Sequence, residues 1–219
     1  IESSSGRFQV RGELGVCVDQ QGGDCRVLLG WDETLERNVW VMKSSRDLPA
    51  LTSARKSVSR PTRIRVLSEH HEPDRCTVIT EAVQGMPLVE YVRLTPGLEW
   101  RSFRPLLAEL VEELAQAQHE GFLPESLCLA QVWIDQQGHA KLLDRPIQPV
   151  GWQSEETRGD RVESEWMPLE PMEMVAGLLD HFIQHQVVPA HVLTFRSEID
   201  VLRNEPQPLL QLGQRLTEL

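Results

Sequence analysis

The chain has 219 residues, of which 40% are hydrophobic and 25% are charged, and its formal net charge is −11. This composition fits an ordinary globular protein of one large domain, or of two lobes that share an interface. The acidic balance argues against general nucleic-acid binding, and no run approaches the roughly 20 consecutive apolar residues that span a bilayer.

The first eight residues, IESSSGRF, contain no initiator Met and no apolar signal core. We therefore expect a segment of a longer protein, located in the cytoplasm or forming the cytosolic part of a larger membrane-associated protein. The four cysteines, Cys17, Cys25, Cys76 and Cys128, form no CxxC pair, which favours reduced, half-buried thiols. His70 and His71 lie side by side in a predicted turn, and no histidine pair has HExxH context, so we expect no metal and no cofactor.

The first half of the chain is predicted to be rich in β-strands. Short alternating or β-branched patterns occur at 7–18, 25–31, 37–43, 63–67 and 76–83. The segments QQGGD, WDETLERN and SEHHEPD between them carry the residues of turns. One short helix is predicted over 47–58, with Asp47 as its cap, Pro49 in its first turn and Pro61 after its end.

The pattern becomes helical after the sequence GMPL. Residues 99–120 place apolar side chains at helical spacing, and Gly121 ends the run. The sequences VWI and HAKLLD flank DQQG as a β-hairpin, and a loop over about 145–168 leads to helices near 170–186, 189–203 and 206–218. The order predicts an α+β protein, with a small antiparallel sheet first and a mostly helical half after it.

A resemblance to protein kinases rests first on residues 119–146, HEGFLPESLCLAQVWIDQQGHAKLLDRP. This stretch is similar, without a gap, to the kinase segment that runs from the long helix of the C-lobe through the catalytic loop to the DFG motif. Leu123–Leu127 falls where kinases carry V-H-R-D-L, Gln131 falls on the metal-binding Asn, and Asp144 falls on the DFG aspartate.

The N-terminal half adds to this resemblance. GGDCRVLLGWDETLERNVWVM resembles the end of a glycine-rich loop followed by the strand that bears the nucleotide lysine, and VITEAVQGMPLVEYV resembles the hinge. The resemblance covers about 7–147 and implies a two-lobed kinase-like fold. Its N-lobe would be 1–84, and a truncated, mostly helical C-lobe would be 85–219. The last seventy residues match poorly, as in second, inactive kinase-like domains of large bacterial signalling proteins.

The chemistry of phosphoryl transfer needs a base, metal ligands and a lysine at the phosphates. Ser126 stands at the position of the base and cannot accept a proton near neutral pH. Cys128 replaces a lysine, Gln131 replaces the asparagine, and Asp144 is retained, although we expect the adjacent Arg145 to pair with it. The resemblance therefore implies an inactive site.

The vestigial nucleotide pocket would comprise Gly22, Gly23, Val27, Trp40, Met42, Lys43 and Thr80. Only the middle glycine of the glycine-rich loop, Gly22, is kept. In the gapless register Met42 takes the place of the lysine, Trp40 fills the adenine site and Lys43 points away. A second register, with one more residue in the turn, directs Lys43 inward. No Glu lies between Ser44 and Ser68 to orient an inward lysine.

Three functions remain open from the sequence. The first is a pseudokinase module that binds a protein partner, or a neighbouring domain of its own chain, through the basic segment 43–65 or the acidic segment 151–180. The second is an atypical nucleotide-binding phosphotransferase or nucleotide sensor that uses Lys43, Gln131 and Asp144. The third is an α+β binding domain unrelated to kinases.

Overall fold

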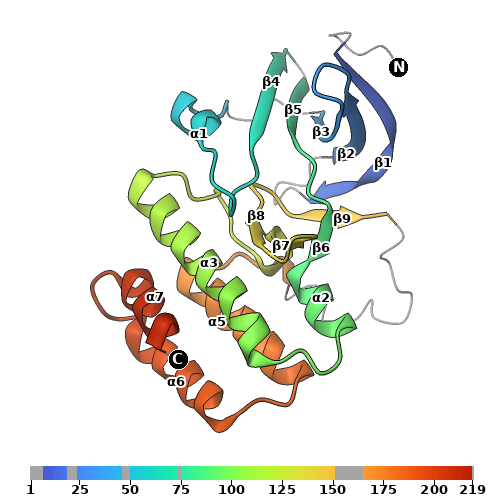
Figure 1. Cartoon of the computed structure of the whole chain (residues 1–219). Helices are drawn as coiled ribbons and strands as arrows, with labels where there is room; N and C mark the ends of the chain where they lie inside the picture. Colours follow the sequence, from blue (N-terminus) through green and yellow to red (C-terminus); the bar gives the residue numbers. More distant parts are fainter. Residues whose placement is uncertain (1–6, 19–23, 46–49, 74, 151–164, 219) are drawn as a thin grey trace.

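The computed structural model describes residues 7–18, 24–45, 50–73, 75–150 and 165–218. It is an α+β structure, as the sequence predicts. Strands β1–β5 lie at one end of the molecule, and the helices α3, α5, α6 and α7 lie at the other (Figure 1). None of the helices within the described ranges is long and apolar enough to cross a membrane.

The main sheet has six strands in the order β4-β5-β3-β2-β1-β9, and every neighbouring pair is antiparallel. The strands are β1 (Phe8–Val18), β2 (Asp24–Asp32), β3 (Arg37–Ser44), β4 (Val66–Glu72), β5 (Arg75–Glu81) and β9 (Ile147–Pro149). The strands predicted at 7–18, 25–31 and 37–43 are confirmed. The short strand β9 was not predicted, since the sequence indicated a loop over about 145–168.

Two local predictions need correction. His70 and His71 belong to β4 and not to a turn, since they pair with Thr77 and Cys76 of β5, and the pairing continues to Glu72 and Arg75. The described part of the predicted helix is a single short segment, α1 (Ser53–Ser57), whose cap is Thr52. The Thr52 hydroxyl accepts a hydrogen bond from the amide of Arg55 at 3.1 Å, which satisfies one free N–H of the first turn. Asp47 and Pro49 lie outside the described residues.

A second, three-stranded sheet has the order β6-β7-β8, with β6 (Gly85–Pro87), β7 (Val132–Asp135) and β8 (Ala140–Leu142). Strands β7 and β8 form the predicted hairpin. Gly138 takes a φ of 84° in its turn, and the Asp135 carboxylate accepts hydrogen bonds from the amides of Gln137 and His139, both at 2.9 Å. The DQQG sequence thus folds as its turn chemistry predicts.

Five helices follow or flank this sheet: α2 (Leu88–Leu94), α3 (Trp100–Glu120), α5 (Pro171–His185), α6 (Ala190–Leu202) and α7 (Pro208–Glu218). The apolar stripe of α3 is buried, and Gly121 ends the helix with a φ of 74°, as predicted. Phe103 of α3 stacks on Phe182 of α5 with 4.3 Å between ring centroids, and Trp100 and Phe195 join them. The helices therefore share one apolar core.

Candidate functional site

An apolar cluster fills the region where the main sheet meets the small sheet. Its buried members are Cys17, Cys25, Val27, Trp40, Met42, Ile64, Val83, Trp133, Leu143 and Ile147. Trp40 of β3 and Trp133 of β7 meet edge to face, with 5.1 Å between ring centroids and 68° between planes. Both indoles are nearly fully buried, at 2% and 3% exposure. The two sheets are thus joined through a packed interior.

The register of β3 decides which side chains enter this cluster. Trp40 and Met42 lie in it, and Val27 is opposite Met42 on β2. Lys43 is half-buried and alternates to the other face of the sheet, where its cross-strand neighbours are Arg26 and Thr77. This is the arrangement that the gapless register expects. Thr80 is fully buried and pairs with Trp40 across β3 and β5. Gly22 and Gly23 lie outside the described residues.

Asp144, directly after the hairpin, is held by two arginines. Arg55 of α1 donates from Nε to Oδ1 at 3.0 Å and from Nη2 to Oδ2, while Arg63 Nη2 donates to Oδ1 at 2.6 Å. Arg55 also donates to the Ile64 carbonyl, and Arg63 to the Phe122 carbonyl. The sequence predicted Arg145 as the partner of Asp144. This was wrong, because within the described ranges the ion pairs of Asp144 are with residues 89 and 81 positions away.

The electrostatics of this group follow from burial and charge. Burial raises the pKa of Asp144, but the charges and hydrogen bonds of Arg63 and Arg55 outweigh it, and the pKa lies below its ordinary value. Burial also lowers the pKa of Arg63, against the opposing effect of Asp144. A metal ion at Asp144 would have to displace two buried guanidinium groups. Asp144 is therefore ionised and fully engaged by cations of the protein itself.

The network continues into α3 through Glu113, which is 1% exposed. Arg60 makes a bidentate contact with Glu113, at 2.8 and 2.9 Å, and also donates to Glu120 at 2.6 Å. Thr62 donates to Glu113 at 2.8 Å, and Arg63 Nη1 lies 3.7 Å from the same carboxylate. Three arginines and three carboxylates thus bind the segment 55–63 to α3 and to Asp144.

Sequence reasoning missed this network, although the sequence contains two signals of it, the basic run 43–65 and Glu113. The basic run 43–65 was interpreted as a surface, yet Arg55 and Arg63 are buried and Arg60 and Lys56 form ion pairs. Glu113 lies three residues after Leu110 and four before Ala117, on the buried face of α3. A carboxylate in an apolar stripe indicates that cations must come from elsewhere in the chain.

Gln131 and Cys128 form a buried turn around the short 3₁₀ helix η1 (Leu129–Gln131). The Gln131 amide accepts from the Cys128 N–H at 2.7 Å and donates to the Leu143 carbonyl at 3.3 Å. Both ends of the side chain are therefore used to hold the loop. Burial raises the pKa of Cys128 to about 11, so its thiol is protonated at neutral pH. All four cysteines are buried, more deeply than predicted.

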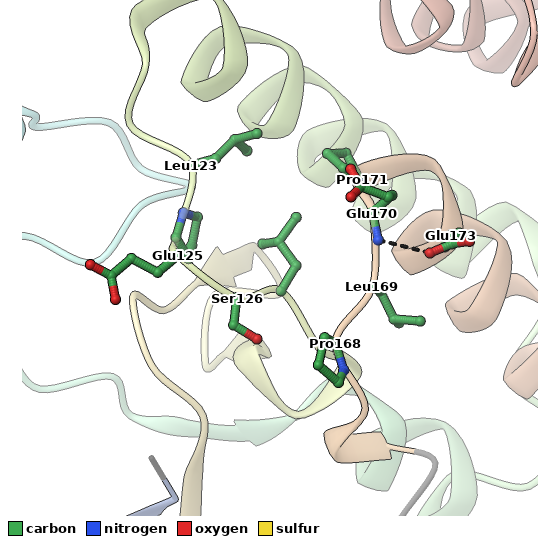
Figure 2. A pocket seen from close by; sticks show the side chains of 10 residues that line it. Leu123, Glu125, Ser126, Pro168, Leu169, Glu170, Pro171 and Glu173 are labelled. Carbon is green, nitrogen blue, oxygen red and sulfur yellow. Dashed lines mark hydrogen bonds between the residues drawn. The ribbon is translucent and has the colours of Figure 1, made fainter. Parts of the chain in front are cut away.

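Ser126 lies in a shallow hollow of about 250 Å³ on the surface of the helical half. Figure 2 shows the two segments that form its walls, Leu123–Leu127 on one side and Pro168–Glu173 on the other. Leucine and proline side chains line it, and the exposed residues Glu125 and Glu170 belong to its rim. Glu173 is engaged by the amide of Glu170, at 2.9 Å, and by Arg203.

Comparison with known proteins adds no family to this description, since no family model and no curated protein matches the chain. The described positions of the predicted site hold a serine, a protonated thiol, a hydrogen-bonded amide and an aspartate that two arginines neutralise. This set offers neither a general base nor an available metal ligand at those positions.

Proposed function

We propose that this chain is a catalytically inactive kinase-like domain, a pseudokinase, that acts as a protein-interaction or regulatory module in bacterial signalling. The observation that carries the proposal is the engagement of Asp144 by Arg55 and Arg63. In an active kinase the corresponding aspartate holds Mg²⁺. Here two fixed guanidinium groups supply the positive charge, which favours a structural role for Asp144 over metal binding.

The packing above Asp144 supports the same proposal. Trp40 and Met42 fill the region between the two sheets, where a kinase-like fold would accommodate adenine and the lysine ammonium group. Lys43 is on the other face of β3, and Gln131 is fully occupied by backbone groups. The alternative of a nucleotide sensor built from Lys43, Gln131 and Asp144 would require all three residues to leave these positions.

The interaction surface that we propose is the hollow around Ser126. The basic segment 43–65, which the sequence offered for docking, is largely consumed by internal ion pairs. In contrast, leucine and proline side chains line the hollow, and two exposed glutamates flank it. The Glu170 carboxylate also accepts a hydrogen bond from the amide of Glu173, and the Glu125 side chain points away from the facing wall (Figure 2). This combination suits a peptide segment of a partner protein, or of a neighbouring domain, that carries basic and apolar residues.

Calorimetric titration with ATP and with ADP, each with and without Mg²⁺, tests whether the chain binds nucleotide, and a phosphorylation assay tests whether it transfers phosphate. We expect no heat of binding. Micromolar, Mg²⁺-dependent binding of ATP together with phosphorylation of a substrate would overturn the proposal.

A peptide library on beads, screened with the purified chain, tests the interaction surface. We expect selection of peptides with Lys or Arg next to leucine, and loss of that selection in Glu125→Lys and Glu170→Lys. Glu205→Lys is the matched control, because Glu205 is an exposed carboxylate away from the hollow. Equal loss in the control would show nonspecific attraction to the acidic protein and would contradict the assignment of this hollow.

A further inference from the structure

Three residues with metal-ligating side chains meet at the end of the β4–β5 pair. Glu69 and His71 are two positions apart on β4 and so face the same side of the sheet. Cys76 is the direct cross-strand partner of His71 on β5. One ligand atom of each residue, a carboxylate oxygen, an imidazole nitrogen and a sulfur, lies within 4.8 Å of the others. We propose that Glu69, His71 and Cys76 form a binding site for Zn²⁺.

The spacing of the ligand atoms fits this ion. Tetrahedral Zn²⁺ with its usual bond lengths places a nitrogen and an oxygen ligand roughly 3.4 Å apart, and a nitrogen and a sulfur ligand roughly 3.6 Å apart. The His71 Nε2 atom lies 3.0 Å from Glu69 Oε1 and 3.8 Å from Cys76 Sγ. Two of the three distances between ligand atoms therefore need to change by only a few tenths of an ångström to fit Zn²⁺.

The chemistry of the donor set narrows the choice of ion. Imidazole, thiolate and carboxylate together suit Zn²⁺, whereas Mg²⁺ and Ca²⁺ take oxygen ligands. Binding releases the thiol proton of Cys76 and places the remaining imidazole proton of His71 on Nδ1, so that Nε2 can bind the ion. The Glu69 carboxylate and the Cys76 thiolate then supply two negative charges to Zn²⁺, while Lys56 remains the partner of the second carboxylate oxygen of Glu69. The His71 side chain is 30% exposed, which leaves a side for water as the fourth ligand.

Residues of the segment 51–57, which contains α1 and is called the α1 segment, already orient the carboxylate of Glu69, whose side chain is 1% exposed. The Leu51 amide donates to Oε1 at 3.0 Å, and Lys56 Nζ lies 2.6 Å from Oε2. Such outer contacts fix the direction of a ligand before the ion arrives. A bound ion would therefore brace β4, β5 and the α1 segment together. The site is independent of the proposed function, because its residues differ from those that hold Asp144.

The test uses the purified chain after treatment with a chelator. The chain competes with a chromogenic indicator for Zn²⁺, which gives the affinity. In a separate experiment Co²⁺ is added as a spectroscopic probe. We expect one Zn²⁺ per chain, a thiolate-to-Co²⁺ charge-transfer band, and a rise in Tm on addition of Zn²⁺. His71→Ala and Cys76→Ser should each weaken binding at least about tenfold.

His70→Ala is the matched control, since His70 neighbours His71 in sequence but alternates to the other face of β4. It should bind Zn²⁺ as the unmodified chain does. The His71→Ala variant removes a partly exposed side chain, and circular dichroism will verify that it is folded. No saturable binding, a Co²⁺ spectrum without the thiolate band, or undiminished affinity in His71→Ala would each overturn the proposal.

Discussion

Arg55 of α1 makes a bidentate ion pair with Asp144, which lies 89 residues later in the chain, directly after the β7–β8 hairpin. Both groups are largely buried, at 5% and 16% side-chain exposure. The pair links the helix of the sheet-rich half to the hairpin of the helical half. Under the kinase-like interpretation, an arginine of the N-lobe helix thus contacts the aspartate that would otherwise bind metal.

Removal of Arg55 should strongly destabilise the fold. Arg55→Met leaves Asp144 buried with Arg63 as its main cation, and breaking a buried pair costs about 3–5 kcal/mol. Urea unfolding monitored by tryptophan fluorescence measures this change. Arg65→Met is the control, because Arg65 is exposed, and it should alter the free energy of unfolding by only about 0.5 kcal/mol.

A double-mutant cycle separates the ion pair from general damage. Asp144→Asn should cost less in the Arg55→Met background than in the unmodified chain, because the interaction is already lost there. Strictly additive free energies would show that the two side chains do not interact, in contradiction to the structure.

The contribution of Asp144 should disappear in acid. The pKa of Asp144 is depressed in the folded state, so the group contributes stability above its ordinary pKa of about 3.9 and loses it as the pH falls toward the folded value. We expect the difference in unfolding free energy between the unmodified chain and Asp144→Asn to be constant near neutral pH and to narrow below about pH 4. Urea titrations of both proteins measure it. A gap that persists unchanged in acid would contradict this assignment.

The Trp40–Trp133 contact predicts a second sensitive position. Trp40→Ala should cost about 3–5 kcal/mol, because it opens a cavity in the cluster and removes the edge-to-face contact. Trp31→Ala is a matched control on the neighbouring strand. Trp31 is half-buried, and its ring is covered by Arg11 at 4.0 Å. Its loss should cost about 1 kcal/mol, and equal costs in chemical denaturation would argue against a packed joint between the sheets.

The elements that sequence predicted well are those that local periodicity specifies. Helix α3 has a continuous apolar stripe and a glycine stop, and the β7–β8 hairpin has strong turn residues. Strands β6 and β9, each three residues long, exist only because they pair with β7 and β1. No local pattern of that length distinguishes a strand from a loop.

The site was predictable in part. Strand alternation alone places Trp40 and Met42 on one face of β3, although it does not say which face is buried. Two groups depend on distant or cross-strand neighbours, which spacing along the chain does not reveal. One is the pair of arginines that hold Asp144, and the other is the cluster of Glu69, His71 and Cys76. The basic run 43–65 and the position of Glu113 in the apolar stripe of α3 were the two local signals of these hidden ion pairs.

A pair of glycines on β1 offers a test of how β9 is held. A Cβ at Gly15 would lie 2.1 Å from the Gln148 carbonyl oxygen, whereas a Cβ at Gly12 would meet nothing within 4 Å. Gly15→Ala must therefore push β9 away, and we expect a loss of about 1–3 kcal/mol. Gly12→Ala should be neutral or stabilising by about 0.5 kcal/mol, because it restricts the unfolded chain.

Hydrogen exchange localises the effect. The amide of Val150 donates to the Leu14 carbonyl at 2.8 Å and reports on the β1–β9 pair. Its exchange should accelerate in Gly15→Ala and stay unchanged in Gly12→Ala, while the amides of α3 keep their protection. Since Ile147 of β9 belongs to the same apolar cluster as Trp40, a displaced β9 would also loosen the joint between the sheets. Unchanged exchange at Val150 in Gly15→Ala would mean that β9 does not approach Gly15 as closely as the structure places it.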